Sequence, residues 1–409
     1  IVLGTIVTVY FLKSLFLVFL TYKQNRFLTN IIAYISNKLF SSYMKQPYSF
    51  HLNRNASELI KNIQVEIEYF YIFLVSIITL FIEGGFVISV LATLIYIEPL
   101  GALSIGLFYG FLSIIFLQFT RRKLNRWGKL RQDLDTQVSK TALEGLGGIK
   151  DLLILGKTYF FIEEYSSKNY FKARLNANQG TVSQIPRFYL ELISIIGLVS
   201  FIILLLLQGK DSASLVTILG VFVAATFRMI PSLNRIIAAT QSMKYYKPSV
   251  DIIYKEIKDN IVFEDNNSKD YNFKNDIEFE NVNFSFTKDS SVLKDINLII
   301  KKGQTIGIIG VSGSGKSTLV DLLVGLHKPT SGEILIDGIN NFQMNQSWRN
   351  NIGYVSQTIY LTDDTIKKNI ALGVPENKIN DSKIIELLKQ VQLETFINSL
   401  KKGINTKVG

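Results

Sequence analysis

Five apolar stretches constrain the fold of this chain more than any other sequence feature. A helix needs about 20 mostly apolar residues to cross the hydrocarbon core of a membrane. Stretches of this kind occupy residues 1–20, 69–97, 100–119, 188–207 and 215–239. Of the 409 residues, 48% are hydrophobic and only 19% are charged, which excludes a purely soluble, disordered or fibrous protein. The sequence therefore predicts a helical membrane region with five spans.

Basic residues in the connections predict how these spans are oriented. They gather in two long connections, at Lys23, Arg26, Lys38, Lys45, Arg54 and Lys61 after the first span and at Arg121, Arg122, Lys123, Arg126, Lys129 and Arg131 after the third. By the positive-inside rule these connections are cytoplasmic, and the short connections at 98–99 and 209–211 lie outside. The first span then begins outside, so we expect a sixth span ahead of residue 1 and interpret the sequence as a fragment.

The cytoplasmic connections have helical periodicity of their own. Apolar residues recur at spacings of three and four positions at Ile31, Ile32, Ile35, Leu39 and Phe40. We therefore expect the membrane helices to extend well into the cytoplasm.

The net charge of +11 raises nucleic-acid binding as an alternative. The basic run at 121–131, however, directly follows a membrane span and lacks the aromatic interleaving typical of a single-strand binder. We therefore predict no nucleic-acid partner. Without cysteine and with only His51 and His327 as histidines, the chain also offers no disulfide, thiolate site or zinc cluster.

Composition divides the chain into three parts. Residues 1–257 form the predicted transmembrane domain with long cytoplasmic helical extensions, and a polar, acidic linker follows at 258–276. Alternating apolar patterns at 277–286 and 292–300 then predict strands, and an apolar strand is predicted at 305–309. Residues 277–409 are therefore predicted to be the N-terminal part of an α/β P-loop NTPase domain.

The motif that identifies this domain is Gly-x-x-x-x-Gly-Lys-Ser, which begins at Gly310 between the predicted strand and an apolar helix at 318–326. A triphosphate needs several backbone N–H groups aimed at one point, and a glycine-rich turn at a helix N-terminus supplies them. Lys316 can neutralise the β- and γ-phosphates, and the Ser317 hydroxyl can bind the bridging Mg²⁺. The predicted ATP-binding residues are Gly310, Ser312, Gly313, Ser314, Gly315, Lys316, Ser317 and Thr318.

A second apolar strand, at 333–336, ends in Asp337 and resembles a magnesium-binding Walker B strand. Gly338 follows at once, and no second carboxylate is present to position an attacking water. We therefore interpret Asp337 as a turn residue.

These residues resemble the ABC transporter nucleotide-binding domain, fused behind its membrane domain as in exporters. The resemblance rests on the P-loop, on Phe286, on Val355-Ser-Gln357 after a predicted apolar strand, and on the final residues 406–409. It implies that Phe286 stacks on adenine and that Gln357 reaches Mg²⁺ and the attacking water. The ordinary alternatives are a core position for Phe286 and a solvated loop for Gln357. Residues 44–50 and 141–155 resemble the two cytoplasmic loops with short coupling helices.

The resemblance also implies what surrounds this chain in the working protein. The family's signature motif, Walker B strand and switch histidine normally follow the position of residue 409, so we expect no ATP hydrolysis from this fragment alone. In the family two nucleotide-binding domains enclose two ATP molecules, which implies a second half-transporter subunit, expected here as a homodimer. The expected location is the inner (plasma) membrane, with several spans and a cytoplasmic nucleotide-binding domain.

Segments at 186–191, 227–236 and 245–254 resemble bacterial flippases of lipid-linked oligosaccharides. The predicted substrate is therefore an anionic, polyprenyl-pyrophosphate-linked glycan. Cations in or beside apolar spans would bind its pyrophosphate, and the candidates are Lys13, Arg187, Arg228 and Arg235. The structural alternative is ion pairing with Glu83 and Glu191, and we expect Glu83 to face the bundle interior and pair with a cation.

The sequence is also compatible with two other functions. The first is a general lipid or multidrug exporter, which would need an apolar, aromatic-lined cavity more than cations. The second is a membrane-anchored P-loop NTPase that acts as a regulator, although one span would suffice for an anchor.

Overall fold

The computed structural model describes residues 2–97, 99–207, 212–259, 271–287 and 290–408. The chain divides into two compact units. The first comprises Ile1–Asn267, Val282–Asp295 and Ile308–Gly332, and the second comprises Ser268–Asn281, Ile296–Gly307 and Glu333–Gly409. Most of the predicted linker, at 260–270, lies outside the described residues. The domain boundaries inferred from composition stay a prediction.

Long helices dominate the first unit, and each predicted apolar stretch falls within one of them. These helices are α1 (Val2–Met44), α4 (Ile67–Ile97), α5 (Pro99–Gly147), α7 (Thr158–Leu207) and α8 (Ser212–Asp259). At 1.5 Å per residue, the 50 residues of α7 extend about 75 Å, far beyond a bilayer core of about 30 Å. The long helices therefore continue well past the predicted spans, and the cytoplasmic placement of these continuations stays a prediction. Among the described residues, Val2–Met44 and Ala56–Ile97 are long and apolar enough to cross a membrane.

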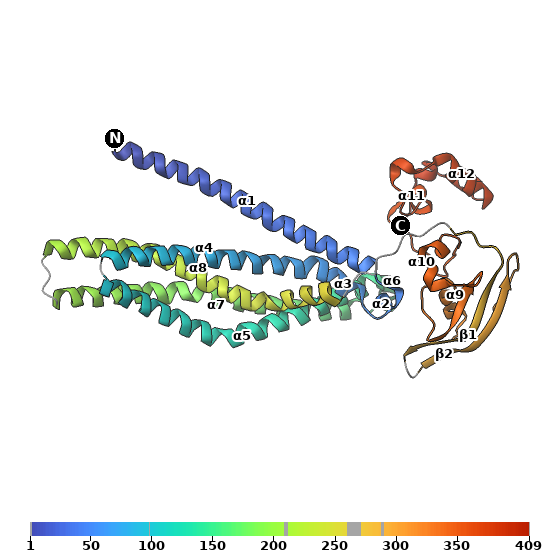
Figure 1. Ribbon diagram of the computed structural model, residues 1–409, viewed down its shortest axis with the longest axis horizontal. Coiled ribbons are helices and arrows are strands. Elements are labelled where there is room, and N and C mark those ends of the chain that lie inside the picture. The colour runs from blue at the N-terminus through green and yellow to red at the C-terminus, as the bar shows by residue number, and fades with distance from the viewer. Residues whose placement is uncertain (1, 98, 208–211, 260–270, 288–289, 409) are drawn as a thin grey trace. The chain divides into compact units, whose positions relative to one another are not determined.

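Short elements connect the long helices. These are α2 (Tyr48–Leu52), α3 (Ala56–Lys61) and the π-helical turn η1 (Asn62–Glu66) before α4, and α6 (Ile149–Ile154) before α7. The two short helices α2 and α6 lie in or beside the segments that resemble coupling-helix loops. Figure 1 shows α4, α5, α7 and α8 side by side, whereas α1 diverges from them toward its N-terminal end.

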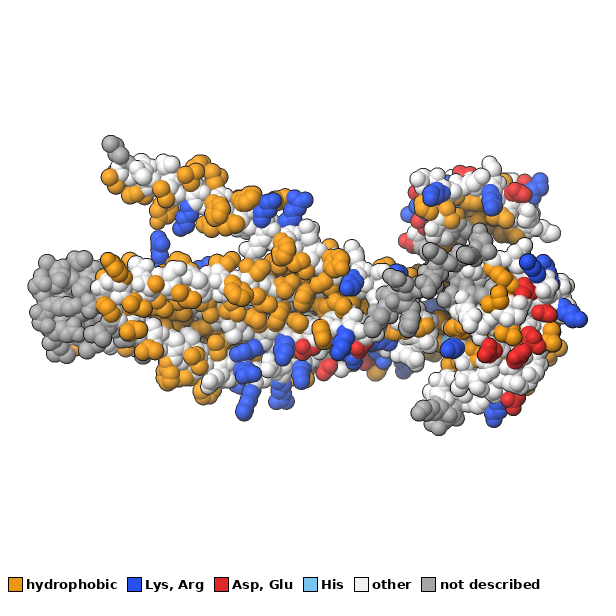
Figure 2. Space-filling view, in the orientation of Figure 1, with side chains coloured by type: hydrophobic (Ala, Val, Ile, Leu, Met, Phe, Trp, Pro, Cys, Tyr) orange, Lys and Arg blue, Asp and Glu red, His pale blue; other side chains and the backbone are white. Residues whose placement is uncertain are grey.

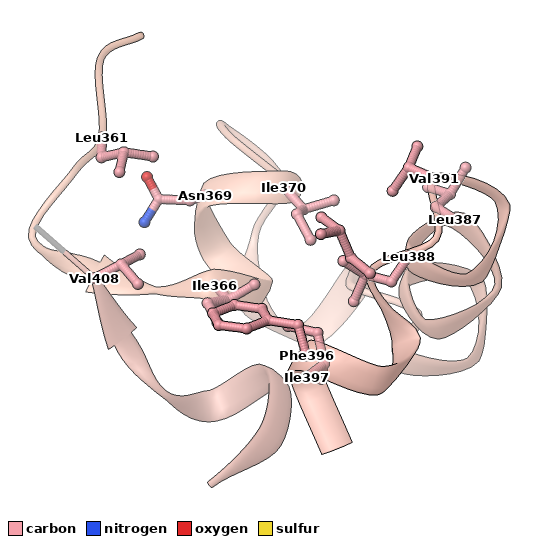
Figure 3. A pocket seen from close by; sticks show the side chains of 11 residues that line it. Leu361, Ile366, Asn369, Ile370, Leu387, Leu388, Val391, Phe396, Ile397 and Val408 are labelled. Atoms are coloured by element: carbon pink, nitrogen blue, oxygen red, sulfur yellow. The ribbon is translucent and has the colours of Figure 1, made fainter. Parts of the chain in front are cut away.

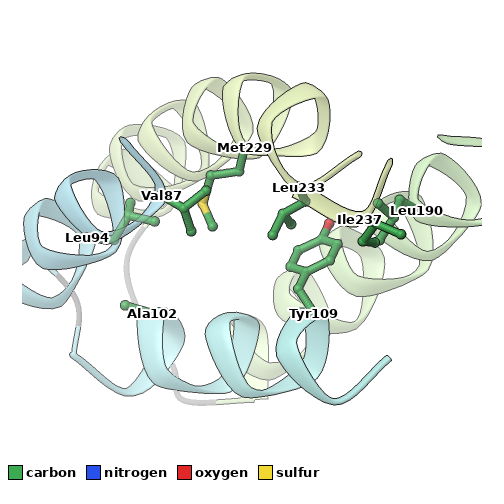
Figure 4. Close-up of a cluster of buried hydrophobic side chains, with 8 residues drawn as sticks. All are labelled: Val87, Leu94, Ala102, Tyr109, Leu190, Met229, Leu233 and Ile237. Atoms are coloured by element: carbon green, nitrogen blue, oxygen red, sulfur yellow. The ribbon is translucent and has the colours of Figure 1, made fainter. Parts of the chain in front are cut away.

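A buried apolar cluster holds four of the long helices together (Figure 4). Its members come from α4, α5, α7 and α8 and are Val87, Leu94, Ala102, Tyr109, Leu190, Met229, Leu233 and Ile237. The Tyr109 hydroxyl donates a hydrogen bond to Ser194, so the one polar group that this ring brings into the cluster is satisfied.

Farther along α5, a buried arginine ties this helix to its neighbours. Arg131 is fully buried, and its guanidinium carbon lies 3.8 Å from the ring centroid of Tyr69 on α4. It lies 5.1 and 5.0 Å from the ring centroids of Tyr245 and Tyr246 on α8, and it donates a 3.0 Å hydrogen bond to the Ser249 hydroxyl. Cation–π contacts gain strength when desolvated, so this aromatic cage fixes how α4, α5 and α8 cross.

The strands after the linker form a four-stranded sheet in the order β2-β1-β3-β4. They are β1 (Asp276–Thr287), β2 (Ser290–Lys301), β3 (Ser331–Ile336) and β4 (Ile339–Asn340), and β3 and β4 pair antiparallel with Ile336 opposite Ile339. The strands predicted at 277–286, 292–300 and 333–336 are confirmed. The helix predicted after the P-loop is α9 (Lys316–Leu323).

The last part of the second unit is a small apolar assembly. Its elements are β5 (Asp364–Thr365), α11 (Ile366–Ile370), η2 (Glu376–Lys378), α12 (Asp381–Gln390), α13 (Glu394–Ser399), η3 (Gly403–Asn405) and β6 (Lys407–Val408), whereas α10 (Asn341–Arg349) precedes them and contacts β4. Strands β5 and β6 pair antiparallel. Figure 3 shows a cavity of about 550 Å³ in this assembly, lined by apolar side chains such as Ile366 and Phe396, and among the described lining residues Asn369 is the only polar one.

Two predicted strands are absent. Residues 304–310 and 352–357 have no regular secondary structure, and Ile309 and Val355 are 97% and 90% exposed. An interior strand is stable only when its N–H and C=O groups pair with neighbours, and no described strand pairs with either segment. Apolar composition alone therefore did not make these segments strands.

Candidate functional site

Three glycines shape the P-loop, two through their backbone conformation and two through close neighbours. Gly313 and Gly315 have φ values of 81° and 88°, in the left-handed region that L side chains rarely adopt. A Cβ on Gly315 would also lie 2.9 Å from the Leu293 side chain, and one on Gly310 would lie 2.7 Å from the Ser314 hydroxyl. The sequence folds here into a tight loop that ends on Gly315, the N-cap of α9.

The P-loop lysine lies across this loop. The Lys316 ammonium donates hydrogen bonds to the carbonyl oxygens of Gly310 and Val311, at 2.9 and 2.8 Å. Its charge is therefore held at the mouth of the loop, beside the first N–H groups of α9. These N–H groups and the positive end of the helix favour an anion at this place.

The hydroxyls of the loop differ in exposure. Ser312, Ser314 and Ser317 are exposed, whereas Thr318, in the first turn of α9, is buried. Ser317 therefore has the accessible oxygen that a magnesium ion bridging two phosphates requires. The residues of this loop fit ATP and Mg²⁺: Gly313 and Gly315 hold a left-handed backbone, the Lys316 ammonium lies at the loop, and Ser317 is exposed.

Phe286 lies at the end of β1 with 54% of its surface exposed. Its ring makes edge contacts with Phe284, at 4.9 Å between centroids, and with His327, at 5.6 Å. Two neighbours thus hold the ring while part of it stays accessible, which is compatible with stacking on a base. The sequence reasoning assigned no role to His327. It is 5% exposed, and burial lowers its pKa, so the ring packs as a neutral aromatic.

Gln357 and Asp337 belong to the second unit. Gln357 is exposed in a segment without regular secondary structure. Asp337 follows β3 with a φ of 47°, and its carboxylate accepts hydrogen bonds from the Tyr271 hydroxyl and from the backbone N–H groups of Lys274, Asn275 and Asp276. Burial raises the Asp337 pKa, but these hydrogen bonds outweigh it and lower the pKa to about 2. Asp337 is confirmed as a turn residue.

The four cations predicted to bind substrate separate into different environments. Lys13 on α1 lies with its ammonium 5.4 Å from the Tyr10 ring, and the Arg228 side chain on α8 interacts electrostatically with the Tyr10 hydroxyl. Tyr10, which the sequence reasoning did not single out, therefore brings two of the four together. Arg235 instead pairs with Glu83, with 2.9 Å between Nε and the carboxylate oxygen.

Arg187 is exposed on α7. The pairing that was expected for Glu83 is confirmed, and for Arg235 the structural alternative holds. Which of these residues bind a ligand stays a prediction.

Known proteins share both parts of this architecture. Residues 293–406 match the family described as "ABC transporter". The chain is 27% identical over 405 residues to the putative multidrug export ATP-binding/permease protein YgaD of Bacillus subtilis, covering 93% of this chain and 66% of that protein. It is 25% identical over 401 residues to the ATP-dependent lipid A-core flippase of Ralstonia nicotianae, covering 96% and 66%.

A solved structure of a bacterial Atm1-family ABC exporter with ATP bound shares the fold. Its TM-score is 0.77 at 22% identity, over 94% of this chain and 68% of that one. The chain thus spans 66% of the length of the two relatives above.

Proposed function

Because the chain belongs to the ABC exporters, with a helical exporter-type region ahead of an ABC transporter domain, we propose that the full-length protein binds ATP-Mg through this chain and couples ATP hydrolysis to export. The observation that carries this proposal is the P-loop. Its three glycines, the ammonium of Lys316 and the N-terminus of α9 form a phosphate cradle. Bound Mg²⁺ would neutralise charge that develops on the phosphates, and Ser317 is the side chain of this loop proposed to hold it, while the role of Gln357 stays a prediction.

We further propose that the working unit is a dimer in the inner (plasma) membrane, expected as a homodimer, with the nucleotide-binding domains in the cytoplasm. Long basic connections on one side of the spans support this orientation. Phe286 is proposed to stack on adenine because its ring is both held and half-exposed.

The proposed substrate is a lipid with a phosphate-bearing head, specifically a polyprenyl-pyrophosphate-linked oligosaccharide. The pair of cations around Tyr10 supports it, because Lys13 and Arg228 lie within the predicted spans and have no carboxylate partner among the described residues. Charged groups at that depth are expensive and mark substrate paths. Arg235 supports the proposal less than expected, since Glu83 already neutralises it.

The second candidate is a general lipid or multidrug exporter, which the name of the Bacillus subtilis relative favours. The third, a membrane-anchored regulator, finds little support in a bundle in which four long helices pack around a common core.

Measuring ATPase activity of the full-length protein in liposomes separates these candidates. A transporter's ATPase is stimulated by its substrate, and we expect stimulation by a pyrophosphate-linked polyprenyl glycan but not by the neutral polyprenol. Arg228→Gln should remove most of the stimulation and leave basal activity. The matched control is Arg26→Gln, because Arg26 also interacts with a tyrosine hydroxyl, that of Tyr22, but lies outside the predicted spans. No stimulation by any lipid would contradict the transporter, and equal stimulation by both lipids would contradict the anionic substrate.

A further inference from the structure

A groove lined by cations runs between α5 and α8, away from the residues proposed to bind ATP or substrate. Its volume is about 560 Å³, and its lining residues, here called the basic groove, are Asn125, Arg126, Lys129, Leu130, Lys247, Pro248 and Asp251. Arg126, Lys129 and Lys247 are exposed. None of these three forms an ion pair within the part of the chain that the structure describes, so three positive charges face one groove that holds one carboxylate.

Further cations extend the groove along α5. Arg121, Arg122 and Lys123 are exposed one to two turns before it, and Figure 2 shows Lys and Arg side chains gathered along α5 at the lower edge of the helical bundle. On the facing helix α8, burial and the nearby charge of Arg121 lower the pKa of Lys244. Like charges thus approach one another across the two helices, and an anion between them would relieve their repulsion.

The walls of the groove are held at a fixed distance. A Cβ on Gly128 of α5 would lie 2.2 Å from the Tyr245 carbonyl oxygen, so the two backbones meet there at the closest approach that glycine permits. Beside this crossing, Arg131 hydrogen-bonds Ser249, and the Gln132 side chain donates to the Pro248 carbonyl at 3.3 Å. The cations therefore project from a rigid floor, which lowers the entropy cost of binding.

The predicted spans place the groove just beyond the lipid headgroups, within reach of its long side chains. With spans predicted to end at 119 and 239, Arg126 and Lys247 lie seven and eight residues beyond, or about 10–12 Å along the two helices. The polar layer of each leaflet is about 5–8 Å thick, and Arg and Lys side chains reach back toward it. Arg121, Arg122 and Lys123 fall within that layer, on the cytoplasmic side, where anionic lipids concentrate.

We propose that the basic groove binds the phosphate-bearing headgroup of an anionic lipid from the cytoplasmic leaflet. Guanidinium and ammonium groups of Arg126, Lys129 and Lys247 donate to the phosphate oxygens, and Asp251 limits how much negative charge the groove accepts. This inference rests on the membrane placement of α5 and α8 and is independent of what the protein exports.

The test measures lipid binding without ATP. Purified protein is titrated with phosphatidylglycerol or phosphatidylcholine, and bound lipids are counted by native mass spectrometry. Replacing Arg126, Lys129 and Lys247 together by glutamine should weaken phosphatidylglycerol binding about tenfold or more, since each basic residue near the surface contributes about 1 kcal/mol. The matched control replaces Lys150, Lys157 and Lys255, three exposed lysines outside the groove, and should bind as the wild type does.

Two further arms make the result decisive. Asp251→Asn should tighten phosphatidylglycerol binding, because it removes the one carboxylate of the groove. Inorganic pyrophosphate tests whether the groove binds a soluble phosphate compound instead of a lipid. Added to lipid-bound protein, it should not displace phosphatidylglycerol. Equal losses in the groove and control variants, or equal binding of the two lipids, would overturn the proposal. Groove-dependent binding of pyrophosphate without groove-dependent lipid binding would overturn its assignment to a lipid.

Discussion

The Arg235 guanidinium on α8 lies with its Nε 2.9 Å from a carboxylate oxygen of Glu83 on α4. Glu83 is 13% exposed at its side chain and Arg235 is 58% exposed, so the carboxylate is the desolvated member of the pair. Within an apolar span, a carboxylate facing lipid would be costly or protonated, and the pair avoids both. Glu83 is thus a link between two helices of the bundle.

The first prediction concerns this pair. Glu83→Gln and Arg235→Gln should each destabilise the bundle, and the double variant should lose less than the sum of the two. We expect a coupling free energy of about 1 kcal/mol, as for polar pairs between membrane helices. Thermal unfolding of the four proteins in detergent measures it. Additive losses would mean that the two side chains do not interact in the membrane.

The second prediction concerns the crossing of α5 and α8. Gly128→Ala would place a methyl group 2.2 Å from the Tyr245 carbonyl oxygen, so the helices must separate, at a cost of about 1–3 kcal/mol in unfolding free energy. The control is Gly110→Ala in the same helix, where no heavy atom lies within 4 Å of the new Cβ. Because alanine favours a helix over glycine, Gly110→Ala should not destabilise. Equal effects of the two substitutions would contradict the close approach.

The third prediction is a pH dependence in the second unit. Hydrogen bonds to the Asp337 carboxylate lower its pKa to about 2, below the ordinary value of 3.8. A group with a lowered folded-state pKa stabilises above its ordinary pKa and loses this effect as the pH falls. The stabilisation should therefore be full at pH 5 and decline between about pH 4 and pH 2.

Hydrogen exchange gives a local readout of the same contact. In Asp337→Asn, which cannot carry the charge, the backbone amides of Lys274, Asn275 and Asp276 should exchange faster than in the wild type at neutral pH. Thermal unfolding of this variant should also depend less on pH below 4. Unchanged exchange at all three amides would remove Asp337 as their anchor.

The fourth prediction tests the adenine contact. Phe286→Ala should weaken ATP binding about tenfold, since stacking of a base on an aromatic ring contributes about 1–3 kcal/mol, and Phe286→Tyr should retain it. Phe396→Ala is the control, because that ring is equally exposed, at 56% against 54%, but belongs to the other unit. Fluorescent nucleotide titration measures the affinities. If Phe286→Ala bound ATP with full affinity, Phe286 would have only a packing role and would not stack on adenine.

Much of the fold could be predicted because its signals are local. A long apolar stretch predicted a long helix, and a glycine-lysine-serine motif beside an apolar helix predicted a tight loop at a helix N-terminus. Asp337 was also predictable, since the glycine after it marks a turn. In each case neighbouring residues in the sequence determine the conformation.

The remaining features depend on partners distant in sequence. Residues 305–309 have the composition of a strand but no strand pairs with them, and strand formation depends on pairing. Arg228 and Arg235 lie seven residues apart on the same helix, yet Arg228 interacts with Tyr10 and Arg235 pairs with Glu83. Which partner each arginine contacts depends on how α8 is rotated relative to α1 and α4, and this rotation cannot be predicted from a single sequence. The aromatic cage around Arg131 was missed for the same reason.

The central claim, ATP-driven export of a lipid-linked anion, is tested most directly by a flipping assay. The full-length protein is reconstituted in liposomes with a fluorescent polyprenyl-pyrophosphate-linked glycan, and translocation is followed with and without ATP. We expect translocation only with ATP, and a loss of about a hundredfold or more in Lys316→Ala, because this substitution removes the ammonium of the phosphate cradle while the helices still insert. Translocation that needs no ATP, or that persists in inserted Lys316→Ala protein, would contradict the account.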